Sequence, residues 1–311
     1  MISARFTHRL AVVTAAATWF LLIAGALVTS TGSGLSVPDW PLSYGQWMPP
    51  MVGGVFYEHG HRMVAGTVAL LTVFLAFAVS KTEARAWVRV LAFAAVGLVF
   101  LQAALGGLTV LLRLPPVVSV SHAMLGQTFF CLVTLLACLT STRWELGPRG
   151  QRPYERTLFH FSFGVSVLFF IQLYFGASVR HLHAGLAIPD FPTVYGGFFP
   201  PVWSPQIAFH FCHRMLAYFL CLIVLGFSAR IIAKEKTDRV RVFLSILWVG
   251  FIAIQIQLGA LTIWWRRPVA VTAGHLAVGA LCLVVSVLLA FRIGWAACPE
   301  RRLIPVDKRK R

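Results

Sequence analysis

The sequence has few charged residues and very few acidic ones. Charged side chains make up 12% of its 311 residues and hydrophobic ones 58%, whereas soluble domains carry about 25% charged residues. Asp and Glu together number 10, against 27 Lys and Arg. This scarcity of charge excludes an ordinary soluble globular domain, and apolar runs of about 20 residues are long enough to span a bilayer.

Eight apolar runs predict eight transmembrane helices. The first run is long and further spans follow it, so we interpret it as an anchor and not as a cleaved signal. The predicted fold class is an all-α integral membrane protein. The runs cover residues 10–30, 60–80, 88–111, 118–141, 157–179, 209–230, 241–264 and 269–292.

The net charge of +17 is distributed by loop, which argues against nucleic acid as a partner. The basic segments are the N-terminus, the loops at 81–89, 143–156 and 230–241, and the C-terminal tail, and they hold most of the Lys and Arg. By the positive-inside rule both termini are therefore cytoplasmic. The basic tail is expected to contact anionic lipid headgroups.

Cysteine chemistry and aspartate-rich metal sites are also missing from the long loops on the outer side. The six cysteines lie elsewhere and form no CxxC motif, so we read them as small apolar residues in helices. Aspartates are few and scattered, which argues against a magnesium-dependent prenyltransferase. A transporter with parallel repeats would have charged residues near the midplane of the membrane, and none is visible.

The chain contains a tandem duplication. Residues 34–41 (GLSVPDWP) match residues 185–192 (GLAIPDFP), and a Tyr-Gly pair follows each copy. Each half has four spans, so both halves share one topology, and an axis along the membrane normal relates them. We predict two tandem four-helix bundles, 1–145 and 146–311, joined by a polar cytoplasmic linker at 142–156.

Each half carries a Gly- and Pro-rich outer loop of about 30 residues, longer than most connections. The Pro-Asp-aromatic-Pro core of this loop cannot be helical, and we interpret the loop as a folded aromatic lid. Glycines also recur in the third span of each half, at Gly106-Gly107 and at Gly259. They indicate either close helix packing or room for a flat ligand against the helix.

Four histidines at repeated positions are the strongest indication of function. His61 and His122 open the second and fourth spans, and His213 and His275 are their counterparts in the second half. All four lie near the outer ends of their helices. Ionisable residues inside a membrane are rare and usually functional.

Paired imidazoles on two helices suit a haem iron. A mononuclear zinc or copper site needs three or four protein ligands, and each half offers only two histidines. A porphyrin supplies four ligands and needs two axial ones, and four-helix bundles hold such cofactors between their helices. We therefore predict one bis-histidine haem site per half.

Arginines recur beside these histidines. Arg62 and Arg214 follow their histidines directly, and Arg113 and Arg266 follow the third span of each half. Guanidinium groups match carboxylates well, so these four are candidate partners for haem propionates. Interfacial snorkelling is the alternative.

The halves differ at one informative position. Glu58 precedes His61 by one helical turn, whereas the matching residue before His213 is His210. A carboxylate in one half alone suggests that this half does chemistry and the other carries electrons, although a helix-capping role is also open. Four further histidines are interpreted as polar residues on the outer side and as candidates for a supporting role at the site. They are His59, His181, His183 and His210.

Taken together, these residues resemble the haem A synthase family along essentially the whole chain. The resemblance rests on Glu58-x-x-His61-Arg62, on His213-Arg214, on His122 and His275, and on the segment at 25–34 (GALVTSTGSG). It implies oxidation of a porphyrin methyl group of haem O to a formyl group by two hydroxylations, with loss of water from the geminal diol. Some members have a cysteine pair in the outer loops, which this chain lacks.

The resemblance also implies roles for the residues. His61 and His122 would ligate haem O, the substrate, in the N-terminal half, with Glu58 as the catalytic carboxylate. His213 and His275 would ligate haem b, a cofactor that passes electrons, in the C-terminal half. Haem O synthase, cytochrome oxidase assembly and a homo-oligomer are the expected partners, and the expected location is the bacterial inner membrane with haem sites toward the outer face. The alternative function is a di-haem b electron carrier of the quinol oxidoreductase type.

Overall fold

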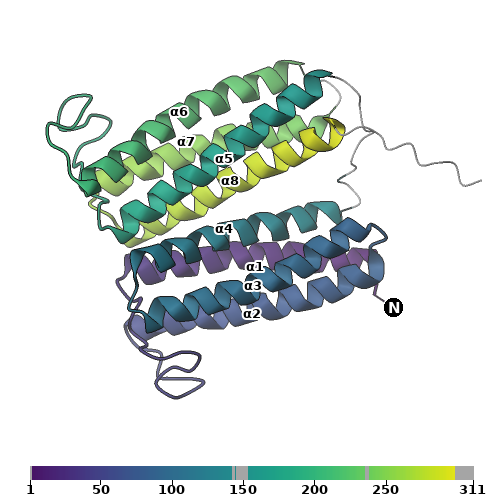
Figure 1. The fold of residues 1–311 in the computed structure, drawn as a ribbon, viewed down its shortest axis with the longest axis horizontal. Coiled ribbons are helices and arrows are strands. Elements are labelled where there is room, and N and C mark those ends of the chain that lie inside the picture. Colours follow the sequence, from purple (N-terminus) through teal and green to yellow (C-terminus); the bar gives the residue numbers. More distant parts are fainter. Residues whose placement is uncertain (1, 142–143, 145–152, 235–237, 298–311) are drawn as a thin grey trace, which may run out of the picture.

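The computed structural model describes residues 2–141, 144, 153–234 and 238–297, and within them the chain is helical, without named strands (Figure 1). Eight helices are long and apolar enough to cross a membrane, so the predicted eight spans are confirmed. The polar linker, the C-terminal tail and Cys298 lie wholly or largely outside the described residues. The helices are α1 (Ala4–Ser30), α2 (Gly54–Thr82), α3 (Ala86–Leu111), α4 (Pro116–Leu139), α5 (Pro153–His181), α6 (Pro205–Lys234), α7 (Arg239–Trp264) and α8 (Val269–Ala297).

The helices form two four-helix bundles that lie side by side (Figure 1). In the first bundle α1 packs on α2 and α4, and α3 packs on the same two helices. In the second, α5 and α7 each pack on α6 and α8. Consequently α2 and α4 stand at opposite corners of one bundle, and α6 and α8 at opposite corners of the other.

Both long loops lie at one end of the molecule, which we call the lid end (Figure 1). Lid 1 connects α1 to α2, and lid 2 connects α5 to α6. The helix ends here use left-handed residues: α3 is followed by Arg113 and Leu114 (φ 59° and 60°), and α7 by Trp265, then Arg266 and Arg267 (φ 54° and 66°). Proline comes next in each case: Pro116 is the first residue of α4, and Pro268 directly precedes α8. A missing N–H costs nothing at these places.

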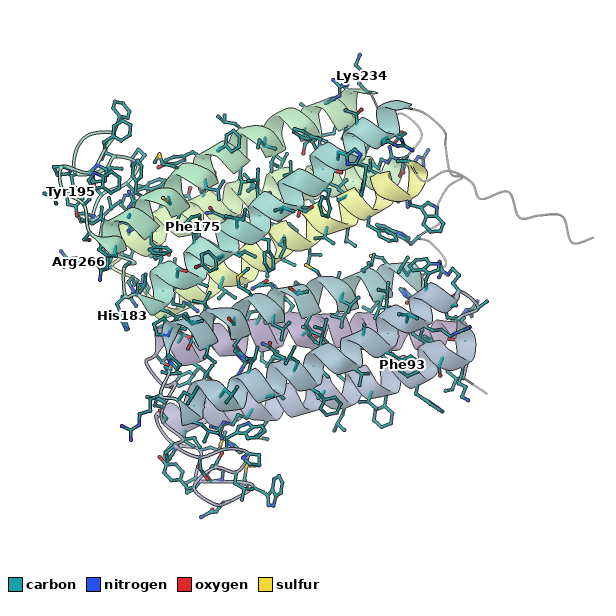
Figure 2. All side chains as sticks on the ribbon, viewed as in Figure 1. Phe93, Phe175, His183, Tyr195, Lys234 and Arg266 are labelled. Carbon is teal, nitrogen blue, oxygen red and sulfur yellow. The ribbon has the colours of Figure 1, made fainter. Side chains whose placement is uncertain are left out.

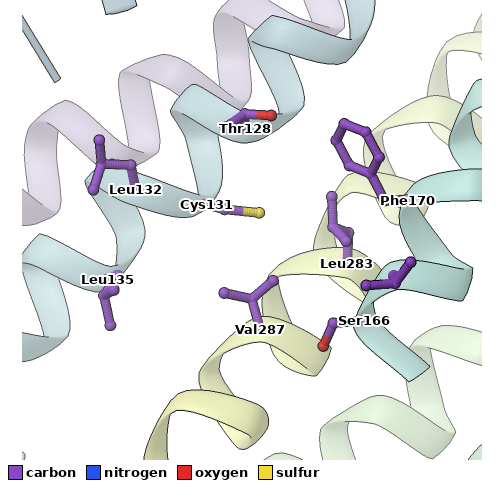
Figure 3. Close-up of a pocket in the computed structure, with 9 residues that line it drawn as sticks. Thr128, Cys131, Leu132, Leu135, Ser166, Phe170, Leu283 and Val287 are labelled. Carbon is purple, nitrogen blue, oxygen red and sulfur yellow. The ribbon is translucent and has the colours of Figure 1, made fainter. Parts of the chain in front are cut away.

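The two bundles meet along α1 and α4 on one side and α5 and α8 on the other, a contact that we call the seam. Trp19 of α1 donates its indole N–H to the carbonyl of Ala277 in α8, with an N–O distance of 3.0 Å. A cavity of about 380 Å³ opens in the seam near the middle of the helices (Figure 3). Its walls are mostly apolar and carry no charged side chain, so it is not a site of acid–base chemistry. They comprise Thr128, Cys131, Leu132, Leu135, Ser166, Val167, Phe170, Leu283 and Val287.

An ionic network ties the second bundle together at the end opposite the lids. Asp238 caps α7 by accepting the N–H groups of Val240 and Arg241. The same carboxylate pairs with Arg292 of α8 at 2.7 Å and with the Arg241 side chain at 3.3 Å. Arg241, 3% exposed, also pairs with Glu155 of α5. One aspartate therefore links three helices.

Replacing Asp238 should destabilise the second bundle. Asp238→Ala removes a helix cap, worth about 1 kcal/mol, and weakens two largely buried ion pairs, for which losing a partner costs roughly 3–5 kcal/mol. We expect a loss of at least about 3 kcal/mol, measured as a lower midpoint of thermal unfolding in detergent. Glu83→Ala is the control, because its partner Arg85 is 36% exposed and such pairs contribute about 0–1 kcal/mol. Equal midpoints for the two variants would contradict the proposed importance of this network.

Candidate functional site

The four predicted histidines form two pairs, one in each bundle. His61 on α2 and His122 on α4 come from opposite corners of the first bundle and are close enough to interact electrostatically. His213 on α6 and His275 on α8 occupy the corresponding corners of the second. The ring centres of His213 and His275 are 6.3 Å apart, and the ring planes are inclined by 73°.

This separation fits two imidazoles on opposite sides of one metal ion. Metal–imidazole bonds are about 2 Å long and each ring centre lies roughly 1 Å beyond its nitrogen, so the two centres should be about 6 Å apart. No group of three His, Cys, Asp or Glu side chains converges anywhere in the described part of the chain. Each pair thus suits an ion whose remaining ligands come from elsewhere, as the porphyrin of a haem provides.

Each of the four imidazoles lies against a glycine of the neighbouring helix. A methyl group on that glycine would lie 3.1–3.2 Å from Cε1 of the ring, so only glycine lets the ring approach the helix this closely. At the repeated positions 106 and 259 the group packed against the glycine is an imidazole. The pairs are Gly25–His61, Gly106–His122, Gly176–His213 and Gly259–His275.

Three of these glycines have a glutamine one turn earlier in the same helix. The amide nitrogen of Gln102 lies 2.8 Å from the carbonyl oxygen of His122, and that of Gln172 lies 3.0 Å from both the carbonyl oxygen and Nδ1 of His213. Gln255 contacts the ring of His275 at 3.4 Å. The Gln-x-x-x-Gly spacing in α3, α5 and α7 is the signal that our sequence analysis overlooked. In α1 the corresponding residue is Leu21.

Arg62 and Arg214 are predicted to bind haem propionates. In the structure, both side chains donate hydrogen bonds to the backbone of the lids. Nη1 of Arg62 donates to the carbonyl oxygens of Asp39 and Leu42 in lid 1, at 2.8 and 2.9 Å. Nη1 of Arg214 donates to the carbonyl oxygen of Asp190 in lid 2, at 2.7 Å. Each lid is therefore fastened to the residue that follows a paired histidine.

Glu58 and His210 occupy the same place in the two halves. The Glu58 carboxylate, 4% exposed, accepts the N–H of Val37 at 2.8 Å and pairs with Arg62 at 2.8 Å. His210 contacts the N–H of Ile188 at 3.3 Å and Nε of Arg214 at 3.2 Å. A carboxylate accepts both bonds, whereas a neutral imidazole has one acceptor nitrogen. At this one position the contacts of Glu58 are accordingly shorter than those of His210.

The spacing between Asp and the following Tyr-Gly pair is the same in both lids, and hydrogen bonds explain it. Asp39 accepts the N–H groups of Tyr44 and Gly45, and Asp190 accepts those of Tyr195 and Gly196. The bonds from Gly45 and Tyr44 lower the pKa of Asp39.

Asp190 behaves in the same way. Its partial burial alone would raise the pKa, but the bonds from Gly196, Thr193 and Tyr195 outweigh burial and lower it to about 2. Because the folded pKa is depressed, this carboxylate stabilises the lid above the pKa of the unfolded chain and loses that effect only as the pH falls toward about 2. Both lid turns are therefore held by ionised aspartates at neutral pH.

Each lid rests on the third helix of its bundle through an aromatic residue. A methyl group at Gly107 of α3 would lie 2.7 Å from Cδ2 of Trp40, so the indole needs glycine beneath it. The second half has Ala260 at the place of Gly107 and the smaller Phe191 at the place of Trp40. Phe191 contacts α7 through Trp264, with the ring centres 6.0 Å apart.

A second, smaller cavity lies beneath lid 1. It measures about 190 Å³ and is lined by Pro41, Gln46, Trp47, His59, Arg62 and Met63. His59 contacts the hydroxyl of Ser43 in the lid at 2.8 Å, and its Nε2 is buried without a partner. His59 and His210 are thus both lid contacts.

The remaining predicted residues lie at the lid end of the helices. Arg113 and Arg266 are exposed in the turns after α3 and α7. His181 ends α5, and His183 follows it with φ 54°. Figure 2 shows His183 and Arg266 at the same end of the bundle as Tyr195 of lid 2. Arg180 and Arg267, which sequence reasoning did not select, are neighbours of this group.

Comparison with known proteins places this architecture in a family. Residues 51–287 match the profile described as cytochrome oxidase assembly protein, COX15-CtaA. The chain belongs to the COX15-CtaA family. It is also similar to proteins named Heme A synthase from three bacteria. Identity is 27% to that of Alkalihalophilus pseudofirmus (90% of this chain and 92% of the relative). It is 30% to that of Shouchella clausii (75% and 79%), and 31% to that of Symbiobacterium thermophilum (76% and 79%).

The glycine contacts predict a specific defect. Gly106→Ala, Gly176→Ala or Gly259→Ala should displace the adjacent imidazole by a few tenths of an ångström and lower haem retention about 10-fold, the lower range for changes that support a metal ligand. Haem content per chain, measured by absorbance after purification, tests this.

Matched controls lie on the same three helices. A methyl group at Gly97 (α3), Gly164 (α5) or Gly250 (α7) would meet nothing within 4 Å, so the corresponding alanine variants should retain haem normally. Equal haem content in the test and control variants would refute the role of the glycines.

The contact of Trp40 with Gly107 can be tested by transplanting the pair from the second half. Gly107→Ala alone should cost about 1–3 kcal/mol, the usual cost of overpacking, and Trp40→Phe alone should leave a gap. The double variant reproduces the Phe191–Ala260 combination and should recover most of the lost stability. Thermal unfolding of the four proteins in a double-mutant cycle measures the coupling, and strict additivity would show that the two residues do not pack together.

Proposed function

We propose that this chain is a haem A synthase, an oxidoreductase that converts a methyl group of haem O to the formyl group of haem A. Membership in the COX15-CtaA family and the names of the relatives support this function. The observation that carries it is the equivalent imidazole pair in each bundle, with 6.3 Å between the ring centres of His213 and His275, together with a carboxylate beside only one of the pairs. The methyl is hydroxylated twice, and the geminal diol then loses water.

The two halves divide the work. The N-terminal half, 1–145, holds haem O between His61 and His122, and the C-terminal half, 146–311, holds haem b between His213 and His275. Haem b, when bound, supplies an iron that accepts and passes on electrons. The imidazoles position the two irons in neighbouring bundles, and the lids limit access of bulk water to the reacting methyl group.

Glu58 is the proposed catalytic carboxylate. It stands one turn before His61 on the same face of α2, and Arg62 keeps a positive charge 2.8 Å from it. From this place the carboxylate accepts a proton or stabilises positive charge that develops on the substrate carbon. Its second bond, to the N–H of Val37 in lid 1, joins this role to the closed lid.

The arginines at the lid end would hold the propionates of bound haems. Arg113 and Arg266 have side chains exposed there, and Arg62 and Arg214 support the lid backbone above. All four stay predicted propionate partners.

The chain resides in the bacterial inner membrane with both termini in the cytoplasm, so the lids and haem sites face the outer side. A haem O synthase supplies the substrate, a terminal oxidase under assembly receives the product, and a second copy of the chain is a further candidate partner. The cytochrome oxidase assembly description of the family supports this placement.

Glu58→His separates catalysis from lid anchoring. This change gives the first half the residue that holds the lid in the second half, so lid 1 should stay folded and haem should stay bound. Loss of the carboxylate should lower haem A formation by about 10²–10⁴-fold, the usual contribution of a general acid or base. The measurement is mass analysis of haems extracted from a strain that supplies haem O.

The wild-type chain should yield haem b with haem O or haem A, and Glu58→His should yield haem b with haem O alone. Normal haem A in that variant would restrict Glu58 to lid anchoring. Two haems b and no haem A from the wild-type chain would overturn the synthase assignment and indicate the di-haem electron carrier. Expression and monodispersity of each protein exclude a folding defect.

A further inference from the structure

A group of basic residues lies at the lid end of the seam, and we call it the seam cluster. It consists of Arg180 and His181 in the last turn of α5, His183 just beyond, and Arg267 in the turn between α7 and α8. His183 and Arg267 have left-handed backbone, with φ 54° and 66°. None of these residues has a role in the function proposed above.

Contacts bring the cluster together and fix it on the seam. Nη2 of Arg180 donates to the hydroxyl of Ser30 in α1 at 3.1 Å, so this guanidinium bridges the two bundles. Arg267 runs along the loop after α5, since a methyl group at Gly185 would lie 3.3 Å from its Cδ and 3.6 Å from its Nε.

The cluster has no acidic counterpart. The acidic residues of the lid end are Asp39, Glu58 and Asp190, and each is engaged within a lid or with Arg62. In the described part of the chain no carboxylate pairs with Arg180 or Arg267. Arg180 is partly buried and donates to a neutral hydroxyl, and a partly buried charge without a counter-charge is costly. An anion from outside the chain would remove that cost.

The cluster also lies between the two imidazole pairs. α5, whose last turn carries Arg180 and His181, packs on α4 and on α8, the helices of His122 and His275. All four cluster residues belong to the second half, and α5 packs on both α6 and α8, the helices that carry His213 and His275. An anion bound by Arg180 would therefore lie beside the group held by His213 and His275.

The first half of the duplication lacks the positive charge of the seam cluster. The positions in the first half that correspond to Arg180, His181, His183 and Arg267 are occupied by Thr29, Ser30, Gly32 and Leu114. Arginine is scarce on the outer side of membrane proteins. The extra cations of the second half thus call for a ligand specific to that half.

We propose that the seam cluster binds the propionate carboxylates of the haem held between His213 and His275, with Arg180 as the principal contact. Guanidinium groups bind carboxylates through two parallel charge-assisted bonds. This assignment rests on the proposed function, because it takes haem as the ligand of that histidine pair. It adds a residue set that neither the repeated arginines nor the lids include.

The test compares haem b with its dimethyl ester, in which both carboxylates are blocked. The full-length chain, purified from haem-deficient cells, is titrated with each compound, and binding is followed by the low-spin absorbance spectrum. Wild-type protein should bind haem b about 10-fold more tightly than the ester, because a charge-assisted bond contributes roughly 1.5–3 kcal/mol. Arg180→Gln should lose most of this preference, and Arg180→Lys should retain more of it.

Arg5→Gln is the control, since Arg5 is an exposed arginine near the start of α1, at the end opposite the lids. It should keep the wild-type preference. Equal binding of haem b and ester by the wild-type chain, or an unchanged preference in Arg180→Gln, would overturn the proposal and leave the bis-histidine site standing. Absence of any His213-dependent spectrum would instead overturn the haem b assignment on which the proposal rests.

Discussion

The packing of an imidazole ring directly against the backbone of the neighbouring helix is the constraint on which the rest of this structure depends. A side chain as small as a methyl group on any of the four glycines would press on the ring at 3.1–3.2 Å. At each contact, the distance between the two helices and their rotation about their axes are therefore fixed. Four such contacts, two in each bundle, set the positions of all four histidines from the helix backbones themselves.

The lids follow from the same frame. Each is fastened by the arginine next to a paired histidine and rests on the third helix, close to the glycine that receives an imidazole. Trp40 lies on Gly107, and the adjacent Gly106 receives His122. The imidazole and lid 1 thus rest on consecutive residues of α3. Their relative position therefore does not depend on the long, irregular path of the loop.

The number of helices and the identity of the four histidines could be predicted from the sequence, because apolar length and exact repetition are local signals. The glycine contacts could be suspected only at Gly106 and Gly259, where two aligned spans both carried them. Gly25 and Gly176 lie in other spans, and the meeting of a glycine with a ring on another helix is not visible in a linear pattern. Arg62 illustrates a different limit, because its position beside His61 is compatible with a haem carboxylate, while its bonds in the folded chain go to lid carbonyls.

The adjacency of His61 and Arg62 has a mechanical consequence. His61 packs against Gly25 of α1 and the next residue, Arg62, is bonded to lid 1, so a single turn of α2 transmits displacement between them. Lifting lid 1 pulls on the turn that carries His61, and a shift of that imidazole strains the lid bonds. The second bundle has the same linkage through His213 and Arg214, with the longer contacts of His210 in place of Glu58. In both halves, therefore, the lid and the imidazole next to its anchoring arginine are expected to move together.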